Sequence, residues 1–230
     1  MLIISIEGNI GSGKSTLINK LKKEFTSVEM TPVIYIDEPV RVWNTIMDKN
    51  GDNIIKKYYE DQKKYAFQFQ MMAYITRITE LRKSMEKYNG NCIIITERSI
   101  ETDKEVFAKM LYETKILDNI SYTIYLKWFE ELSRDLKVNE LIYLKTDPET
   151  ALKRVIKRNR PGETIPIDYL KDCHERHERW LHKRDDVLLL NGERDIDESF
   201  NDKLLVIKTA VGHWNNCLLY TSPSPRDVLR

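Results

Sequence analysis

The chain has 230 residues, which suits one α/β domain and is enough to bury a sizeable core. Charged residues make up 32% and hydrophobic residues 41%, and 37 Lys and Arg side chains face 36 Asp and Glu, for a net charge of +1. Because no overall field draws the protein to nucleic acid or to a membrane, neither is expected as a partner. The three cysteines have no paired spacing, and no signal peptide or long apolar run precedes the first strand, so we expect a cytoplasmic protein.

The first predicted element is a buried strand over residues 1–5, which leads into a glycine-rich loop that spells GxxxxGKS and then into a helical pattern over residues 14–25. Such a loop turns its backbone N–H groups inward, and the helix N-terminus adds partial positive charge, so this order predicts a phosphate site. The motif places Lys14 at the β- and γ-phosphates of a nucleotide and the Ser15 hydroxyl on Mg²⁺. The expected nucleotide-binding residues of the loop are Gly8, Asn9, Ile10, Gly11, Ser12, Gly13, Lys14, Ser15 and Thr16.

The next elements bring further polar side chains to the ends of strands. A short strand over residues 33–36 leads to Glu38, which Pro39 keeps out of a helix. Parallel α/β sheets carry ligand chemistry at this end of a strand, so Glu38 is a candidate site residue. A short helix then carries Trp43, and the stretch over residues 54–87, without Gly or Pro, predicts one long helix.

A buried strand over residues 91–96 delivers the sequence Glu97-Arg98-Ser99 to its carboxyl end. Further strands are expected at residues 140–145 and 186–190, and further helices at 101–112, 119–136, 148–158, 166–183 and 197–210. The residues 146–149, TDPE, have the pattern of a capping box before the helix at 148–158. Strands that alternate with helices predict a doubly wound parallel sheet of five strands flanked by helices, of the P-loop NTPase type.

The predicted domain spans residues 1–216, and the segment 217–230 does not continue its pattern. That segment resembles the translation of a common sequencing-library adapter. The hypothesis is that the native chain ends near Asn216 and that the tail is non-native; an ordinary Pro/Ser-rich tail is the alternative.

Several motifs together resemble those of the deoxyribonucleoside kinase family, in family order from residue 3 to about residue 190. They are EGNIGSGKST at 7–16, EPV at 38–40 with Trp43, FQFQ at 67–70, ERS at 97–99 and RNRPGE at 158–163. The resemblance implies transfer of the γ-phosphoryl group of ATP to the 5′-hydroxyl of a deoxynucleoside. It also implies a short helical-hairpin lid at about residues 154–166.

The resemblance implies a role for each polar residue near the phosphates. Glu38 matches the general base, Arg98 matches the residue that holds this base and the 5′-oxygen, and Lys14 completes the catalytic set. Glu97 matches the carboxylate at the Mg²⁺ shell, with water between the two, and so joins Ser15 as a candidate Mg²⁺ ligand. A structural ion pair at the strand ends is the alternative for Glu38, Glu97 and Arg98.

Five cations crowd into residues 153–160, and such a run is usually a solvated face or an anion site. The resemblance implies that Arg154, Arg158 and Arg160 contact the phosphates of ATP from the lid. Lys153 and Lys157 are expected to face solvent.

The resemblance also outlines the acceptor site. Gln70 matches the glutamine that reads the base edge, and Trp43, Phe67 and Met71 are expected to form apolar walls around the ring. Tyr59 and Glu163 match the residues that bind the sugar 3′-hydroxyl. Packing in the core is the alternative for the aromatic residues, since most aromatics at helical spacing are buried there.

Arg77 and Asp103 match a pair that sits over the base in the deoxycytidine and deoxyguanosine kinase branch. Arg77 lies two helical turns after Gln70, so both are expected to face the same pocket. The resemblance therefore predicts a preference for deoxycytidine or purine deoxynucleosides over thymidine, and it implies a homodimer. A nucleoside monophosphate kinase and a P-loop regulatory ATPase are the alternative functions.

Overall fold

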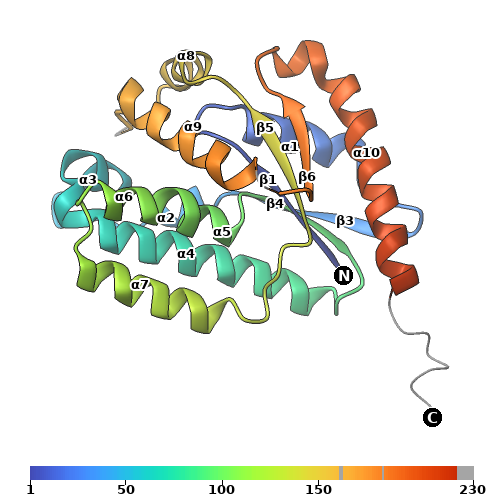
Figure 1. Ribbon diagram of the computed structural model, residues 1–230, viewed down its shortest axis with the longest axis horizontal. Coiled ribbons are helices and arrows are strands. Elements are labelled where there is room, and N and C mark those ends of the chain that lie inside the picture. Colours follow the sequence, from blue (N-terminus) through green and yellow to red (C-terminus); the bar gives the residue numbers. More distant parts are fainter. Residues whose placement is uncertain (161–162, 183, 222–230) are drawn as a thin grey trace.

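The computed structural model describes residues 1–160, 163–182 and 184–221, and its centre is a sheet with the strand order β2-β3-β4-β1-β5-β6 (Figure 1). The strands are β1 (Leu2–Glu7), β2 (Ser27–Val28), β3 (Thr31–Ile36), β4 (Ile93–Glu97), β5 (Glu140–Lys145) and β6 (Val187–Asn191). The five predicted strands pair in parallel, while β2 adds an antiparallel edge next to β3. A strand as short as β2 has no periodic pattern, which is why the sequence did not predict it.

The central strands are apolar because both faces of the sheet are covered. In the pairing of β1 with β4, Leu2 lies opposite Ile93 and Ile4 opposite Ile95, and each of these side chains is at most 2% exposed. The parallel pairing of β3 and β1 with β4 brings the carboxyl ends of these three strands together at one edge.

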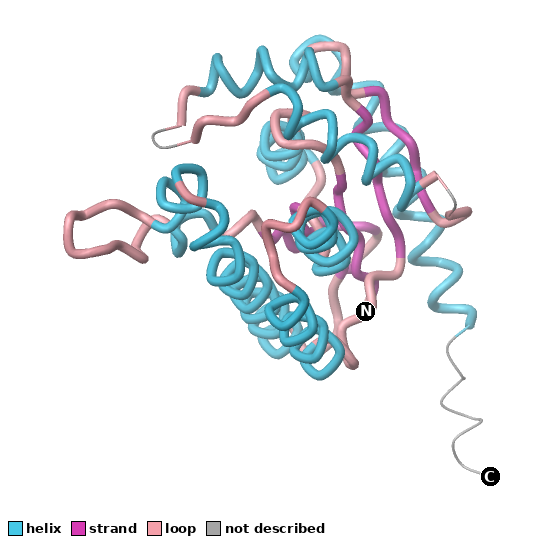
Figure 2. The backbone as a smooth tube through the Cα atoms, turned by 60° about the vertical axis from the view of Figure 1, so that its left-hand side comes forward, coloured by secondary structure: helices cyan, strands magenta, loops and turns pink. Residues whose placement is uncertain are grey.

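Two groups of helices cover the two faces. The helices are α1 (Lys14–Glu24), α2 (Val40–Trp43), α3 (Ile54–Glu60), α4 (Gln62–Lys87), α5 (Ile100–Thr102), the π-helical turn η1 (Asp103–Ala108), α6 (Lys109–Glu113), α7 (Asn119–Leu132), α8 (Pro148–Arg158), α9 (Ile167–Leu181) and α10 (Ile196–Thr221). One core cluster joins the sheet to α1 and α10, and another joins the opposite face to α4, α7 and α9. Figure 2 shows the strands enclosed by helices from both sides. Within the described ranges, none of the helices has the length and apolar character needed to cross a bilayer.

The predicted single helix over residues 54–87 is wrong in one respect, because it is broken at Asp61 into α3 and α4. The backbone of Asp61 leaves the helical region, and its carboxylate accepts a hydrogen bond from the backbone N–H of Lys64 at 3.1 Å. Asp61 therefore caps the start of α4. Because neither Gly nor Pro lies at the break, the sequence pattern predicts one continuous helix.

Helix α10 extends beyond its predicted end at residue 210 and beyond the proposed native end at Asn216. Trp214 and Leu218 pack against the core cluster that α1 and the sheet form. Residues up to Leu218 thus belong to the packed domain. Residues 222–230, which make up most of the proposed non-native tail, lie outside the described residues, so that hypothesis stays a prediction.

Replacing Asp61 with alanine should destabilise the protein by about 1 kcal/mol, because the first turn of α4 loses its capping acceptor. Asp61→Asn is the matched control, since asparagine caps as well as aspartate. Urea denaturation followed by circular dichroism measures both. Equal stability of the alanine variant and the wild type would show that Asp61 does not cap the helix.

Candidate functional site

A cavity of about 490 Å³ lies where the carboxyl ends of β1, β3 and β4 meet the helices α2 to α4, α8 and α9. This is the edge at which parallel α/β sheets bind ligands. The predicted site residues that line it are Ile10, Gly11, Gly13, Lys14, Ser15, Thr16, Glu38, Trp43, Tyr59, Gln70, Arg77, Glu97, Arg98, Asp103, Arg154, Arg158, Arg160 and Glu163. Most of the predicted site residues therefore line the same cavity.

The loop between β1 and α1 is shaped by its close approach to α8. A Cβ atom on Gly11 would lie 2.3 Å from the carbonyl oxygen of Ala151, so only glycine fits there, and the residue also has a φ of +80°. Asn9 lies behind the loop, where its side-chain amide donates to the carbonyl oxygen of Leu170 at 2.8 Å. Contacts with α8 and α9 therefore fix the backbone conformation of the loop before a phosphate binds.

Lys14 folds back over this loop. Its Nζ atom donates to the carbonyl oxygens of Gly8 at 3.0 Å and Asn9 at 2.7 Å. Burial and, after it, the charge of Arg98 lower the pKa of Lys14 to about 7, although the charge of Glu97 acts in the opposite direction. An anion bound in the loop would restore the charged form of Lys14.

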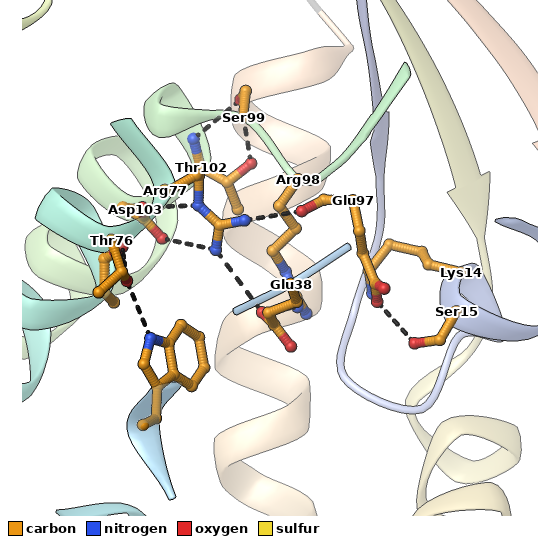
Figure 3. A network of polar contacts seen from close by, with 12 residues as sticks. Lys14, Ser15, Glu38, Thr76, Arg77, Glu97, Arg98, Ser99, Thr102 and Asp103 are labelled. Carbon is orange, nitrogen blue, oxygen red and sulfur yellow. Dashed lines mark hydrogen bonds and ion pairs between the residues drawn. The ribbon is translucent and has the colours of Figure 1, made fainter. Parts of the chain in front are cut away.

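Ser15 and Glu97 form the candidate metal position. The Ser15 hydroxyl donates to Oε1 of Glu97 at 2.7 Å beside the phosphate loop (Figure 3). Hard oxygen ligands at this spacing fit Mg²⁺, which keeps several waters and takes the remaining oxygens from a nucleotide. The described part of the chain holds no group of three or more His, Cys, Asp or Glu that could bind a metal by itself.

Glu38 and Arg98 meet as predicted. Nη1 of Arg98 donates to Oε1 of Glu38 at 2.8 Å, and its Nη2 donates to the carbonyl oxygen of Gly8 at 3.3 Å. The guanidinium lies 5.3 Å from the ring centre of Phe107. Arg98 has a φ of +65°, a strained conformation for a residue with a side chain, which aims the guanidinium back across the sheet edge.

Arg77 is the centre of the polar network in Figure 3. Its Nε donates to Asp103 at 3.0 Å, its Nη1 donates to the carbonyl oxygen of Glu97 at 2.7 Å, and its Nη2 lies 3.6 Å from Glu38. Burial opposes the charge of Arg77, but Asp103 and Glu38 outweigh it and raise its pKa. Arg77 therefore links Asp103 to Glu38, the candidate general base.

Glu7 lies behind the cavity and supports it, a role that the sequence did not predict. This fully buried carboxylate accepts from the Ser5 hydroxyl at 2.6 Å and from the backbone N–H of Ser99 at 2.9 Å, and it also accepts from the Thr102 hydroxyl. It ties the turn that contains Arg98 to the end of β1. A charged residue that interrupts the apolar run of β1 just before the glycine loop is the signal that could have revealed it.

The end of the cavity next to α3 and α4 is aromatic, although the structure does not place Phe67 or Met71 on it. Both side chains pack with the core on the sheet side of α4, and Phe69 lines the cavity instead. Gln70 and Arg77 share one face of α4. On a helix with 3.6 residues per turn, Phe69 flanks this face on one side, whereas Phe67 and Met71 flank it on the opposite side.

Other residues that the sequence did not single out also line this end: Ile55, Tyr58, Ala73, Phe107 and Tyr169. The indole N–H of Trp43 donates to Thr76 at 3.0 Å, which fixes the ring as a wall. Gln70 is 2% exposed, and its amide forms no hydrogen bond with any residue in the described ranges. That amide remains available to a ligand.

The lid residues divide into two groups. Glu163, whose side chain is 4% exposed, pairs with Arg158 and lies 3.6 Å from Arg160. Arg154 instead donates to backbone carbonyl oxygens. Lys157 is exposed, as expected, and it also lines the cavity. Pro161 and Gly162, at the predicted tip of the lid, lie outside the described residues.

Glu38 should stay ionised far into the acid range. Burial favours its neutral form, but the charges of Arg98, Arg77 and Lys14 outweigh burial and lower its pKa to about 2. Because the folded pKa lies below the usual value of 4.5, the stability that this ionised group contributes is present above about pH 4.5 and is lost as the pH falls toward 2.

A ¹³C NMR titration, with Glu38→Gln to identify the carboxyl signal, should give a midpoint near pH 2. The variant Arg98→Met should move this midpoint upward, because it removes the nearest cation. A wild-type midpoint at 4.5 or above would contradict the ion pairing.

Comparison with known proteins agrees with this geometry. A family model described as deoxynucleoside kinase matches residues 4–214. A protein named "Probable deoxycytidine kinase" from fowlpox virus is 39% identical, with 85% of this chain and 81% of that protein covered. Human deoxycytidine kinase is 34% identical, with 87% and 85% covered, and a mitochondrial deoxyguanosine kinase of Xenopus laevis is 30% identical, with 85% and 83% covered.

The family match extends over most of the chain, and the fold carries its phosphate loop, lid and strand-end carboxylates around one cavity. The chain belongs to the deoxynucleoside kinase family, phosphotransferases with a P-loop NTPase fold.

Proposed function

We propose that this kinase transfers the γ-phosphoryl group of ATP to the 5′-hydroxyl of deoxycytidine or of a purine deoxynucleoside, in preference to thymidine, as a step of nucleotide salvage. The observation that carries the proposal is the buried Arg77–Asp103 pair beside the unpaired amide of Gln70. The names of the relatives, which are deoxycytidine and deoxyguanosine kinases, support the same choice.

The base preference follows from hydrogen-bond chemistry. Cytosine and adenine carry an exocyclic amine that can donate to the carboxylate of Asp103, whereas thymine has a carbonyl oxygen and a methyl group at the corresponding positions. Guanine offers acceptors that suit the guanidinium of Arg77. A buried carboxylate opposite the thymine carbonyl oxygen would leave two acceptors facing each other, which is unfavourable.

In the proposed reaction, Glu38 accepts the proton of the 5′-hydroxyl while Arg98 holds Glu38 and the acceptor oxygen. A carboxylate with a pKa of about 2 is a weak base, so its cationic neighbours must be neutralised first. The phosphates of ATP, bound next to Lys14 and Arg98, would supply this neutralisation and raise the basicity of Glu38. Catalysis would then begin only when the donor is in place.

The remaining charges act on the donor. Lys14 and the lid residues Arg158 and Arg160 would stabilise the charge on the transferring group. Ser15 and Glu97 would hold Mg²⁺, which supplies charge neutralisation across the phosphates when bound. Tyr59 and Glu163, which line the cavity together, would bind the sugar 3′-hydroxyl.

Two alternatives remain testable. In a nucleoside monophosphate kinase the acceptor carries a phosphate, which the carboxylate of Glu38 would repel. In a P-loop regulatory ATPase, hydrolysis would proceed without a nucleoside, and the closed aromatic end of the cavity would have no ligand.

We also propose that the protein is a cytoplasmic homodimer. The exposed side chains of Ile120, Ile124 and Trp128 are spaced by one helical turn along α7, and Ile75 on α4 is also exposed, which supports an interface on these two helices. The buried, unbridged thiols of Cys92 and Cys173 support a reducing compartment.

Phosphoryl transfer from ATP should be measured with the four deoxynucleosides and with deoxycytidine monophosphate. We expect the highest kcat/KM with deoxycytidine or a purine deoxynucleoside, and a fall in kcat of about 10²- to 10⁴-fold in Glu38→Gln. Phosphorylation of the monophosphate alone would favour the monophosphate kinase, and hydrolysis without an acceptor would favour the regulatory ATPase.

The double variant Arg77→Met with Asp103→Ala should reverse the base preference toward thymidine, because it removes the buried charges that oppose the thymine carbonyl oxygen and methyl group. The ratio of kcat/KM for thymidine and deoxycytidine measures the change. The proposal on base preference fails if the wild type already uses thymidine best.

A further inference from the structure

A second, much smaller cavity lies behind the candidate site, between the sheet and α4. Its volume is about 10 Å³. Arg77, Glu97 and Arg98 line both cavities, so the small one adjoins the polar network that surrounds Glu38. A volume of roughly 10–15 Å³ is the least that holds one water molecule. The small cavity thus has room for one water and for no larger ligand.

Thr96 is a polar residue in the apolar part of the core that encloses this cavity. Successive side chains of β4 point to opposite faces of the sheet, so Thr96 shares a face with Ile94, and it lies opposite Ile36 of β3 in the parallel pairing. The apolar residues that line the cavity all belong to the core cluster on this face: Ile3, Ile36, Leu81, Ile100 and Val138. Thr96 is 5% exposed, and its hydroxyl has no hydrogen-bond partner among the described residues. A buried hydroxyl without a partner is costly, so this group needs a ligand.

Arg98, which also lines the small cavity, carries a second unpaired atom. Its two terminal nitrogens are engaged, Nη1 with Glu38 at 2.8 Å and Nη2 with the carbonyl oxygen of Gly8 at 3.3 Å. Its Nε atom is buried and has no partner in the described part of the chain. An Nε–H group can only donate, whereas a hydroxyl can also accept. Arg98 and Thr96 therefore bring a donor and an acceptor to a cavity the size of one water.

We propose that the small cavity is a hydration site, in which one buried water accepts from the Nε–H group of Arg98 and donates to the hydroxyl oxygen of Thr96. Cavities that stay dry are lined by apolar groups, whereas buried polar groups without other partners hold water. Through this water, Thr96 acts as a positioning residue for Arg98.

The water contact fixes the direction of the guanidinium. The group is planar, so a partner at Nε restricts how far the two terminal nitrogens can turn. The backbone of Arg98 is already held, because its N–H donates to the carbonyl oxygen of Ile6 at 3.1 Å. With backbone and Nε both held, Nη1 stays directed at Glu38. The inference rests on the proposed function only in this step, where Glu38 acts as the general base.

High-resolution crystal structures of the full chain test the hydration site without any need for activity. Density for one water within about 3.2 Å of both atoms is expected in the wild type and in Thr96→Ser, which keeps the hydroxyl. Thr96→Val keeps the shape of the side chain but removes the hydroxyl, so the water should be lost. A dry cavity in the wild type, or a water that stays in place in Thr96→Val, would overturn the proposal.

Steady-state kinetics with ATP and the best of the four deoxynucleosides test the positioning role. In Thr96→Val, kcat should fall about fivefold to tenfold while the KM for ATP changes by less than about twofold, because Arg98 acts on the general base. Thr96→Ser should recover most of the lost kcat. Ile94→Val is the matched control, since it removes one methyl group from a fully buried residue on the same face of β4, and it should keep the wild-type kcat.

The outcomes separate this inference from the proposed function. If the wild type is active and Thr96→Val keeps its kcat, or if Ile94→Val loses as much, Thr96 does not position Arg98. A wild type that phosphorylates none of the deoxynucleosides would instead refute the proposed function, and the crystal structures would still decide whether the hydration site exists.

Discussion

Three basic side chains are buried at one edge of the sheet, and the site depends on the carboxylates and carbonyl oxygens that surround them. Lys14, Arg77 and Arg98 are each at most 4% exposed. Removing such ions from water costs several kcal/mol each unless anions or carbonyl oxygens surround them. The protein meets this cost with carboxylates and backbone carbonyls already in position, so little reorganisation is needed when phosphates arrive.

Sheet topology supplies those carboxylates. In the order β3-β4-β1, the three strands are neighbours, and Glu38 follows the first while Glu97 and Glu7 end the other two. Parallel pairing brings these ends to one edge, although the residues are far apart in the chain. Each carboxylate has a different partner: Glu38 holds Arg98, Glu97 holds Ser15, and Glu7 holds the turn that begins at Ser99. The same edge thus brings together two carboxylates that pair with other side chains of the cavity and a third that fixes the turn after the strained Arg98.

Close backbone packing shapes the half of the cavity that contains the phosphate loop. Gly11 and Gly192 lie where any side chain would collide with backbone or with Thr146, so the phosphate loop and the segment after β6 pack directly against α8 and its connection to β5. The other half of the cavity depends instead on side chains of α3 and α4. The break at Asp61 allows Tyr58 of α3 to stack on the ring of Phe69 on α4, because the two residues would lie about three turns apart on one straight helix.

The sequence alone determined the five parallel strands, the phosphate loop and the strand-end residues Glu38 and Arg98, since apolar runs and a loop motif depend on neighbours in the chain. Tertiary structure decided the rest. Phe69 rather than Phe67 lines the cavity because helix phase is set by packing, and Glu7 and Arg154 take their partners from strands and loops distant in sequence. The pattern of apolar residues in the sequence indicates which side chains of a single helix or strand can be buried. Only the packed fold determines which residues of different elements meet.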